Sequence, residues 1–180
     1  MKFVLDACVL YPSVLREILQ AAGEEGLYQP LWSDRILGEW TRATVKLGPE
    51  AHAQAQREAA AFALAFPKGR VQAQPAIERS LVLPDPADLH VLAVAIAGGT
   101  EGIVTFNAAD FPRHVLAAEG VQRRDPDGFL WELHSGSPEK MTAIIEAART
   151  RAAAASGREV DLKWLLKRLR LYKLSKALLA

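Results

Sequence analysis

Cysteine is nearly absent from this chain of 180 residues, since Cys8 is the only one. A single cysteine cannot form an internal disulfide or a zinc site built from several thiolates, and it is typical of proteins in a reducing compartment. Long apolar runs are also missing: the first one, residues 3–5, ends at Asp6 and is too short for a signal peptide or a membrane span. We therefore expect a cytoplasmic protein without a membrane segment.

Several other signatures of chemistry are missing. The four histidines have no zinc-type spacing, Gly98-Gly99 is typical of a helix end and not of a phosphate-binding loop, and no pattern favours a serine or cysteine nucleophile. A surplus of one charge is missing too, because the sequence contains 22 Lys and Arg and 21 Asp and Glu. The composition is that of a globular protein, and the net charge neither favours nor excludes a nucleic-acid partner.

What the chain does contain is an alternation of short apolar runs and amphipathic helical patterns. Strands are predicted at residues 3–5, 28–32, 71–73, 103–106 and 121–123, and helices at residues 12–26, 33–47, 49–66, 85–97 and 125–133. This alternation predicts an α/β fold with a central, mostly parallel sheet flanked by helices. Because Gly136-Ser137-Pro138 is a natural boundary, we expect one domain over residues 1–135 and a helical C-terminal extension over residues 136–180.

Acidic side chains lie close to the ends of these elements. Asp6 ends the first strand, Asp110 follows the strand at 103–106, Asp85 and Asp88 open a helix, and Glu39 lies in the second turn of another. Ligands bind beyond the carboxyl ends of parallel strands, so these acids can meet at one edge of the sheet. Clustered carboxylates repel one another unless a cation neutralises them. An all-oxygen set suits Mg²⁺ or Mn²⁺.

Each acid also has a purely structural interpretation. Asp85 before Pro86 is typical of a helix N-cap, and Asp88, three residues later, fits the partner position of a capping box. Asp110 could cap the next turn, and an isolated Glu39 would be an ordinary solvated helix residue. Asp6 has no obvious capping role. Spacing alone therefore leaves a metal site and structural roles equally open.

Four segments resemble, in order, the motifs of the PIN-domain family. Residues 4–10 resemble its opening strand that ends in Asp, residues 33–40 its helix-borne Glu, residues 85–93 its helix-borne Asp, and residues 104–112 its fourth motif. The resemblance covers about residues 1–133. It implies a three-layer PIN-like fold of the kind found in ribonuclease toxins of the VapC type.

This resemblance implies a metal-dependent endoribonuclease that hydrolyses RNA phosphodiester bonds with Mg²⁺ or Mn²⁺, as the toxin of a toxin–antitoxin pair. The expected partners are an RNA substrate and a small antitoxin protein, and a homodimer stays open. Asp6, Glu39 and Asp88 are the implied catalytic and metal-binding acids, with Glu39 either binding metal or orienting the attacking water.

The fourth motif departs from the common pattern of the family. Many relatives have Asp where this chain has Asn107, and others use the acid just before the Phe, which is Asp110 here. We assign the fourth catalytic and metal-binding position to Asp110, with Thr105, Asn107 and Asp85 as supporting residues. Cys8 also replaces the Asn that is common at its place.

Two other functions are compatible with the same residues. A PIN scaffold could act as a non-catalytic RNA- or protein-binding module, although retention of all four acids argues against this. A metal-dependent enzyme for small phosphate esters is the third hypothesis, and it predicts a narrow pocket without an extended basic surface.

The C-terminal segment is rich in basic residues, and no acid follows Asp161. One interpretation is a docked helix with solvated lysines, and the other is a basic arm that contacts RNA phosphates or a partner protein. Calmodulin-like or membrane binding is a weaker alternative. The apolar stripe stops after Tyr172, so one helix docked along its whole length is not expected. The predicted RNA-binding residues are Lys163, Lys167, Arg168, Arg170 and Lys173.

Overall fold

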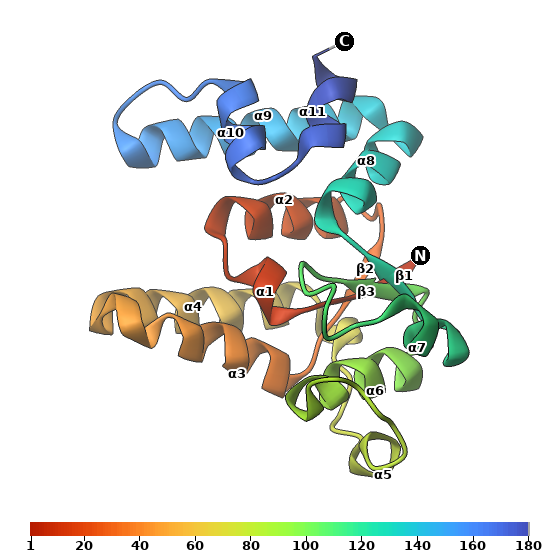
Figure 1. Ribbon diagram of the computed structural model, residues 1–180. Helices are drawn as coiled ribbons and strands as arrows, with labels where there is room; N and C mark the ends of the chain where they lie inside the picture. Colours follow the sequence, from red (N-terminus) through yellow and green to blue (C-terminus); the bar gives the residue numbers. More distant parts are fainter. Residues whose placement is uncertain (180) are drawn as a thin grey trace. The chain divides into compact units, whose positions relative to one another are not determined.

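The computed structural model describes residues 1–179, and these form two compact units. Unit 1 consists of Met1–Tyr11 and Tyr28–Arg124, and unit 2 consists of Pro12–Leu27 and the residues from Asp125 onward. The second unit therefore joins an early helix to the C-terminal helices (Figure 1). The domain boundary after residue 135 remains a prediction.

The elements of unit 1 alternate as the sequence predicts. Its strands are β1 (Lys2–Leu5), β2 (Gln29–Leu31), β3 (Gly102–Val104) and β4 (Gln122–Arg124). Its α-helices are α1 (Ala7–Leu10), α3 (Asp34–Ala43), α4 (Pro49–Ala65), α5 (Pro75–Glu78), α6 (Leu89–Ala97) and α7 (Arg113–Ala118). Short 3₁₀ turns lie at η1 (Val45–Leu47), η2 (Pro67–Gly69) and η3 (Pro86–Asp88).

The four strands form one parallel sheet in the order β2-β1-β3-β4. The central strands β1 and β3 are paired with Val4 opposite Ile103 and Leu5 opposite Val104, and all four of these side chains are fully buried. Helix α6 packs on these two strands. Such apolar central strands are expected in a parallel sheet whose faces are covered by helices, and the α/β fold is confirmed.

Gly102 is required by the close spacing of the sheet. A Cβ atom at this position would lie 2.5 Å from the backbone oxygen of Gln122 and 2.9 Å from the ring of Phe3. The first of these atoms is backbone and cannot turn away. Glycine therefore allows β3 to lie between its neighbours and sets the position of the loop that follows β3, which carries polar residues.

Unit 2 is helical in the part of the chain that the structure describes. It contains α2 (Ser13–Glu24), α8 (Pro126–Gly136), α9 (Pro138–Ser156), α10 (Leu162–Arg168) and α11 (Tyr172–Leu178). Helix α9 packs against α2 and α8, and its buried side chains include Met141, Ile144 and Ile145. Helix α11 packs on α8, where Asp127 accepts hydrogen bonds from the backbone N–H groups of Lys173 and Leu174 at 2.7 and 2.9 Å.

Two regions show where the sequence pattern did and did not identify the structure. The strand predicted at residues 71–73 is wrong, because only Arg70 forms a bridge, to Trp32, and the next residues leave the sheet. As expected, the C-terminal segment is not one helix docked along its whole length, but the break lies earlier than the end of the apolar stripe at Tyr172: Arg170 has a left-handed φ of 61°, and it separates α10 from α11. The break lets Leu171 and Leu174 become buried.

Candidate metal centre

Asp6 lies where β1 ends and α1 begins. Its backbone N–H donates to the carbonyl of Val104 at 3.1 Å, which ties this corner to the end of β3. Although Asp6 is the N-cap residue of α1, its side chain makes no capping hydrogen bond. The residue is only 6% exposed. A buried carboxylate without a capping role needs other partners, and two side chains supply them.

Those partners are Thr105 and Cys8, which both donate to the same oxygen of Asp6. Thr105 Oγ1 lies 2.6 Å from Asp6 Oδ2, and Cys8 Sγ lies 3.1 Å from it. Burial, together with the negative charge of Asp6, raises the pKa of the Cys8 thiol to about 12. The thiol therefore stays protonated and available as a donor at neutral pH. Because both donors occupy Oδ2, they fix the orientation of the carboxylate.

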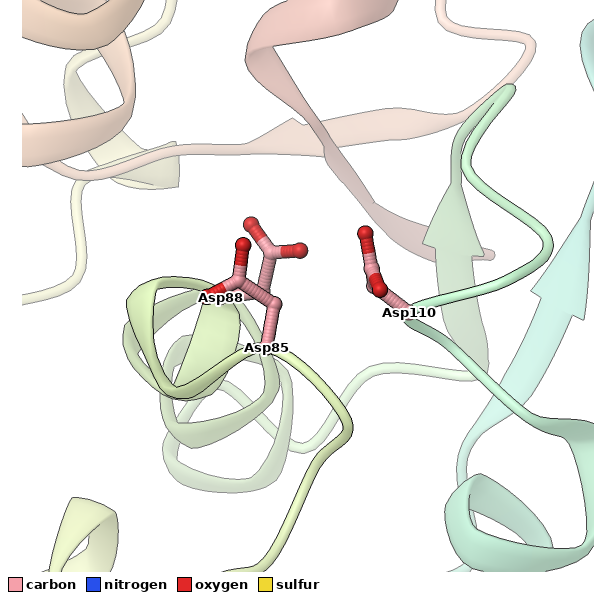
Figure 2. A group of neighbouring side chains, drawn as sticks. All are labelled: Asp85, Asp88 and Asp110. Atoms are coloured by element: carbon pink, nitrogen blue, oxygen red, sulfur yellow. The ribbon is translucent and has the colours of Figure 1, made fainter.

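The carboxyl groups of Asp85, Asp88 and Asp110 come together across two segments of the chain (Figure 2). Asp85 and Asp88 stand at the two ends of the η3 turn that leads into α6, and Asp110 faces them from the loop after β3. One oxygen of each lies within 4.8 Å of the others. Asp85 also caps η3, because its Oδ1 accepts from the Ala87 N–H at 2.9 Å.

Asn107 links the two sides of this cluster. Its Nδ2 donates to Asp88 Oδ2 at 3.2 Å and to Asp110 Oδ2 at 2.8 Å. Its own backbone N–H donates to Thr105 Oγ1 at 2.9 Å. A neutral amide thus holds two carboxylates close together and connects them to the Asp6–Thr105 pair. Capping alone does not account for Asp88, whose side chain makes no capping hydrogen bond at the start of α6.

The electrostatics of Asp88 show that the acids form one group. Burial raises the pKa of Asp88 to about 6, and the charges of Asp6, Asp85, Asp110 and Glu39 contribute to this rise in that order. Asp6 and Glu39 thus act on Asp88 through their charges, but among the described residues the carboxylates that lie within 4.8 Å of one another are those of Asp85, Asp88 and Asp110. Within residues 1–179, no Lys or Arg forms an ion pair with Asp6, Asp85, Asp88 or Asp110.

Glu39 is held at this group by a buried histidine and an exposed arginine. His90 Nε2 lies 2.8 Å from Glu39 Oε1, and Arg35 Nε lies 3.5 Å from the same oxygen. His90 is 2% exposed, and neither ring nitrogen makes a well-aligned hydrogen bond with any residue described. Arg35 is anchored in turn, because it donates to the carbonyl of Ala87 at 3.2 Å. These two contacts orient the Glu39 carboxylate.

The donor set fits a divalent cation. Its atoms are carboxylate oxygens, which are ligands that Mg²⁺ and Mn²⁺ prefer. The raised pKa of Asp88 reflects, besides burial, like-charge repulsion that a cation would remove. The acidic cluster of Asp85, Asp88 and Asp110 is thus a candidate divalent-metal site.

Two residues that contact this site, His90 and Cys8, are not among the site residues that the sequence predicts. The sequence predicts that His90 packs in the core or lies on the surface; it is buried, but it contacts Glu39. Cys8 departs from a common family pattern, and it donates to Asp6. For His90, its position two residues after Asp88 on an apolar helix was the only signal. For Cys8, it was the position two residues after Asp6.

The predicted RNA-binding residues lie in unit 2, whereas the predicted catalytic acids lie in unit 1. Lys163, Lys167 and Arg168 belong to α10, Arg170 to the break, and Lys173 to α11. All five are exposed, and none forms an ion pair among the described residues. Arg168 and Lys173 lie over the rings of Trp164 and Trp131.

Comparisons with known proteins identify the family. A search of curated proteins and of solved structures gave no match to this chain. Across the described residues, every helix is too short or too polar to cross a membrane. The family model for the PIN domain matches residues 2–109, which is more than half of the chain and includes Asp6, Glu39, Asp85 and Asp88. The chain therefore belongs to the PIN-domain family.

Proposed function

We propose that this protein is a metal-dependent endoribonuclease that hydrolyses RNA phosphodiester bonds. PIN domains are typically nucleases, and one observation carries the proposal for this chain: Asp85, Asp88 and Asp110 converge without a cationic partner in the described structure. A domain that had lost catalysis would have no reason to keep several carboxylates in mutual repulsion.

The residues have separate roles in this proposal. When bound at this site, a divalent ion would supply polarisation of a phosphoryl oxygen and activation of a water. We assign Asp88 and Asp110 to holding the ion, with Asn107 fixing their separation. Asp6, oriented by Thr105 and Cys8, completes the negative site.

Glu39 is assigned to the water or to the metal itself. Its contacts with His90 and Arg35 leave it part-exposed, with 27% of the side chain accessible. A carboxylate that is both oriented and accessible can accept a proton from an attacking water. Asp85 has a supporting role, since it also caps η3.

RNA is preferred over small phosphate esters because of the basic segment. Five exposed cations of α10, α11 and their connection are free of carboxylate partners among the described residues, and a row of such charges suits a row of phosphates.

By the same family resemblance we propose that the protein is the toxin of a toxin–antitoxin pair. Its partners would then be a small antitoxin and, in the active assembly, a second copy of the chain.

The decisive experiment is an RNA cleavage assay with purified protein on structured RNAs. Cleavage should require Mn²⁺ or Mg²⁺ and stop with EDTA. Asp88→Asn and Asp110→Asn should each reduce kcat/KM by about 100-fold or more. Asp85→Asn should have a much smaller effect, because asparagine can still cap η3.

Asp34→Asn is the matched control, since Asp34 is an exposed acid of the same unit whose partner is Arg70. It should cleave RNA like the parent. Cleavage that survives thorough chelation would contradict the metal mechanism. Metal-stimulated RNA binding without any cleavage would instead support the non-catalytic binding module.

A further inference from the structure

A pocket lies within unit 2, and none of the residues assigned to catalysis lines it. Its volume is about 530 Å³. It is formed by the end of α9, the loop at residues 157–161, the start of α10 and Val14 of α2. Its walls include the aromatic ring of Trp164 and the side chains of Arg158 and Arg168. The size is that of pockets that accommodate ligands such as a single nucleotide.

The wall of the pocket is held by specific contacts. Arg149 Nη1 donates to the Val160 carbonyl at 3.1 Å and ties the loop at residues 157–161 to α9. Asp161 caps α10, with its Oδ1 accepting from the Trp164 N–H at 2.7 Å. Val160 and Leu165 are buried beneath. The backbone that carries Trp164 is thus fixed, while the residue itself is 50% exposed.

A half-exposed tryptophan that lines a pocket is a stacking surface. The guanidinium carbon of Arg168 lies 5.5 Å from the centroid of the Trp164 ring, within the range of a cation–π contact. Arginine planes and tryptophan rings are side-chain surfaces on which unpaired bases of single-stranded RNA stack. Both are present here, side by side.

The charges around the pocket favour an anionic ligand. Arg158, Lys163, Lys167 and Arg168 have no carboxylate partner within residues 1–179, whereas Lys140 and Arg151 are each paired with an acid. The lining itself is balanced in charge, because it holds Arg158 and Arg168 together with Glu159 and Asp161. The surplus of positive charge comes from the flanking residues, since from Arg158 onward the sequence has seven Lys and Arg against these two acids.

We propose that this pocket binds one unstacked nucleobase of a single-stranded RNA, with the base on Trp164 and the adjoining phosphates on Arg158, Lys167 and Arg168. The inference rests on the proposed function, since it names how the RNA substrate is held. It adds a base-binding subsite to what would otherwise be a charge-only contact. An apolar protein segment would use the ring but would leave the cations without counter-charges.

The test measures the affinity of the full chain for a short, fluorescently labelled single-stranded RNA in EDTA, so that no cleavage occurs. A second RNA of the same length carries one central abasic nucleotide, which keeps every phosphate and lacks one base. Since short RNAs can bind in several registers, a third RNA is abasic throughout. Stacking predicts about ten-fold weaker binding of the fully abasic RNA. The affinity of the singly abasic RNA should fall between those of the other two.

Matched variants locate the effect. Trp164→Ala should weaken binding of the parent RNA by about ten-fold and should bind the fully abasic RNA like the parent protein does. Trp164→Phe should restore most of the loss, because a stacking ring is retained. Trp131→Ala is the control: Trp131 is also partly exposed and also lies under a cation, Lys173, but it does not line the pocket.

Three outcomes would overturn the proposal. The first is that the parent protein binds RNAs with and without bases equally tightly. The second is that Trp164→Ala and Trp131→Ala lose the same amount of RNA affinity. The third is that Trp164→Ala keeps the RNA affinity of the parent while a homodimer dissociates in sedimentation. The last would make the pocket an interface between copies. Failure of the proposed function is seen separately: a parent protein that never cleaves RNA with Mn²⁺, but still shows the Trp164 effect, would retain the base subsite and lose the nuclease.

Discussion

The four aspartates of the candidate metal centre and the cations of α10 and α11 are alike in one respect. Each group gathers charges of one sign without an ion-pair partner among the described residues; the aspartates are Asp6, Asp85, Asp88 and Asp110. They differ in their surroundings. Asp6 is buried and Asp88 is half-buried, whereas Lys163, Lys167 and Arg170 are exposed. Burial concentrates repulsion, and its effect is the pKa of about 6 for Asp88. The exposed cations are separated by water and screened by salt.

This difference indicates two kinds of ligand. A tightly spaced, partly buried set of oxygens suits a small ion with a fixed geometry. A spread of exposed cations suits a long polyanion that contacts many of them loosely. Several charged side chains elsewhere are paired, as in Arg149–Glu146 and Arg151–Glu17. We expect ligands to act at the two unpaired groups because each gathers charges of one sign.

Among variants that keep every acid of the candidate metal centre, we expect His90→Leu to have the largest effect. His90→Leu should weaken Mn²⁺ binding, measured by calorimetry, and reduce kcat/KM by about 10- to 100-fold, because Glu39 then lacks the group that contacts its Oε1 at 2.8 Å. His90→Gln should recover part of both values, since its amide can reach the same oxygen. His134→Leu in unit 2 is the control. If His90→Leu lowers only the melting temperature, His90 is a core residue without a positioning role.

A smaller effect is expected when the basic side is changed. The triple variant of Lys163, Lys167 and Arg170 to Ala keeps the Trp164–Arg168 pair and removes three unpaired cations. Its RNA affinity should fall less steeply with salt, and the slope should decrease by about 0.7 for each phosphate that is no longer neutralised.

The matched control for that variant changes Arg70, Lys140 and Arg151 to Ala, which removes the same charge from side chains that already form ion pairs. Its salt dependence should match the parent's. Equal slopes for the two triple variants would mean that net charge alone, and not the unpaired segment, attracts RNA. Fluorescence titrations at several salt concentrations give both slopes.

Much of the fold could be predicted from local patterns in the sequence. Apolar runs identified β1 and β3 because both strands are buried on two faces, and Ser33 marked the start of α3 because its hydroxyl accepts from the Ile36 N–H. The strand prediction for residues 71–73 is wrong, because the pairing with Trp32 ends at Arg70 and Val71, and a local pattern does not show how far a partner strand continues. The grouping of α2 with the C-terminal helices in unit 2 depends on long-range packing and has no local signal.

For the candidate site, the sequence indicates that acids can meet at one edge of the sheet, but it does not indicate their supporting contacts or that Asp85 joins Asp88 and Asp110. Asp6 and Asp88 could be selected because they lie at element ends next to apolar runs. The hydrogen bonds of Asn107 to Asp88 and Asp110 depend on side-chain directions in a loop, which spacing does not give. The contact between His90 and Glu39 joins helices that are far apart in sequence. These contacts come from tertiary structure, and they are also what orients the acids.

The smallest effect we predict concerns the stability of the metal-free protein, and it tests whether the acids repel one another. An acid whose pKa is raised on folding binds its proton more tightly in the folded state. Its contribution to the stability of the folded protein therefore falls as pH rises from about 4 toward 6, the pKa of Asp88, and stays low above pH 6.

Asp88→Asn removes this loss of stability, which is called the penalty below. In EDTA at pH 7.5 the variant should therefore melt roughly 2 to 4 °C above the parent, the change that about 1 kcal/mol produces in a chain of this size. At pH 4 the two proteins should melt together, because Asp88 is then largely protonated in the folded state and carries little of the penalty. Asp85→Asn keeps the cap of η3 and removes one of the charges that act on Asp88, so it should raise the melting temperature at pH 7.5 by less than Asp88→Asn does. Adding Mn²⁺ at pH 7.5 should raise the melting temperature of the parent more than that of Asp88→Asn. A variant that melts below the parent at both pH values would show that the hydrogen bond from Asn107 matters more than the repulsion, and the like-charge account of the acidic group would be wrong.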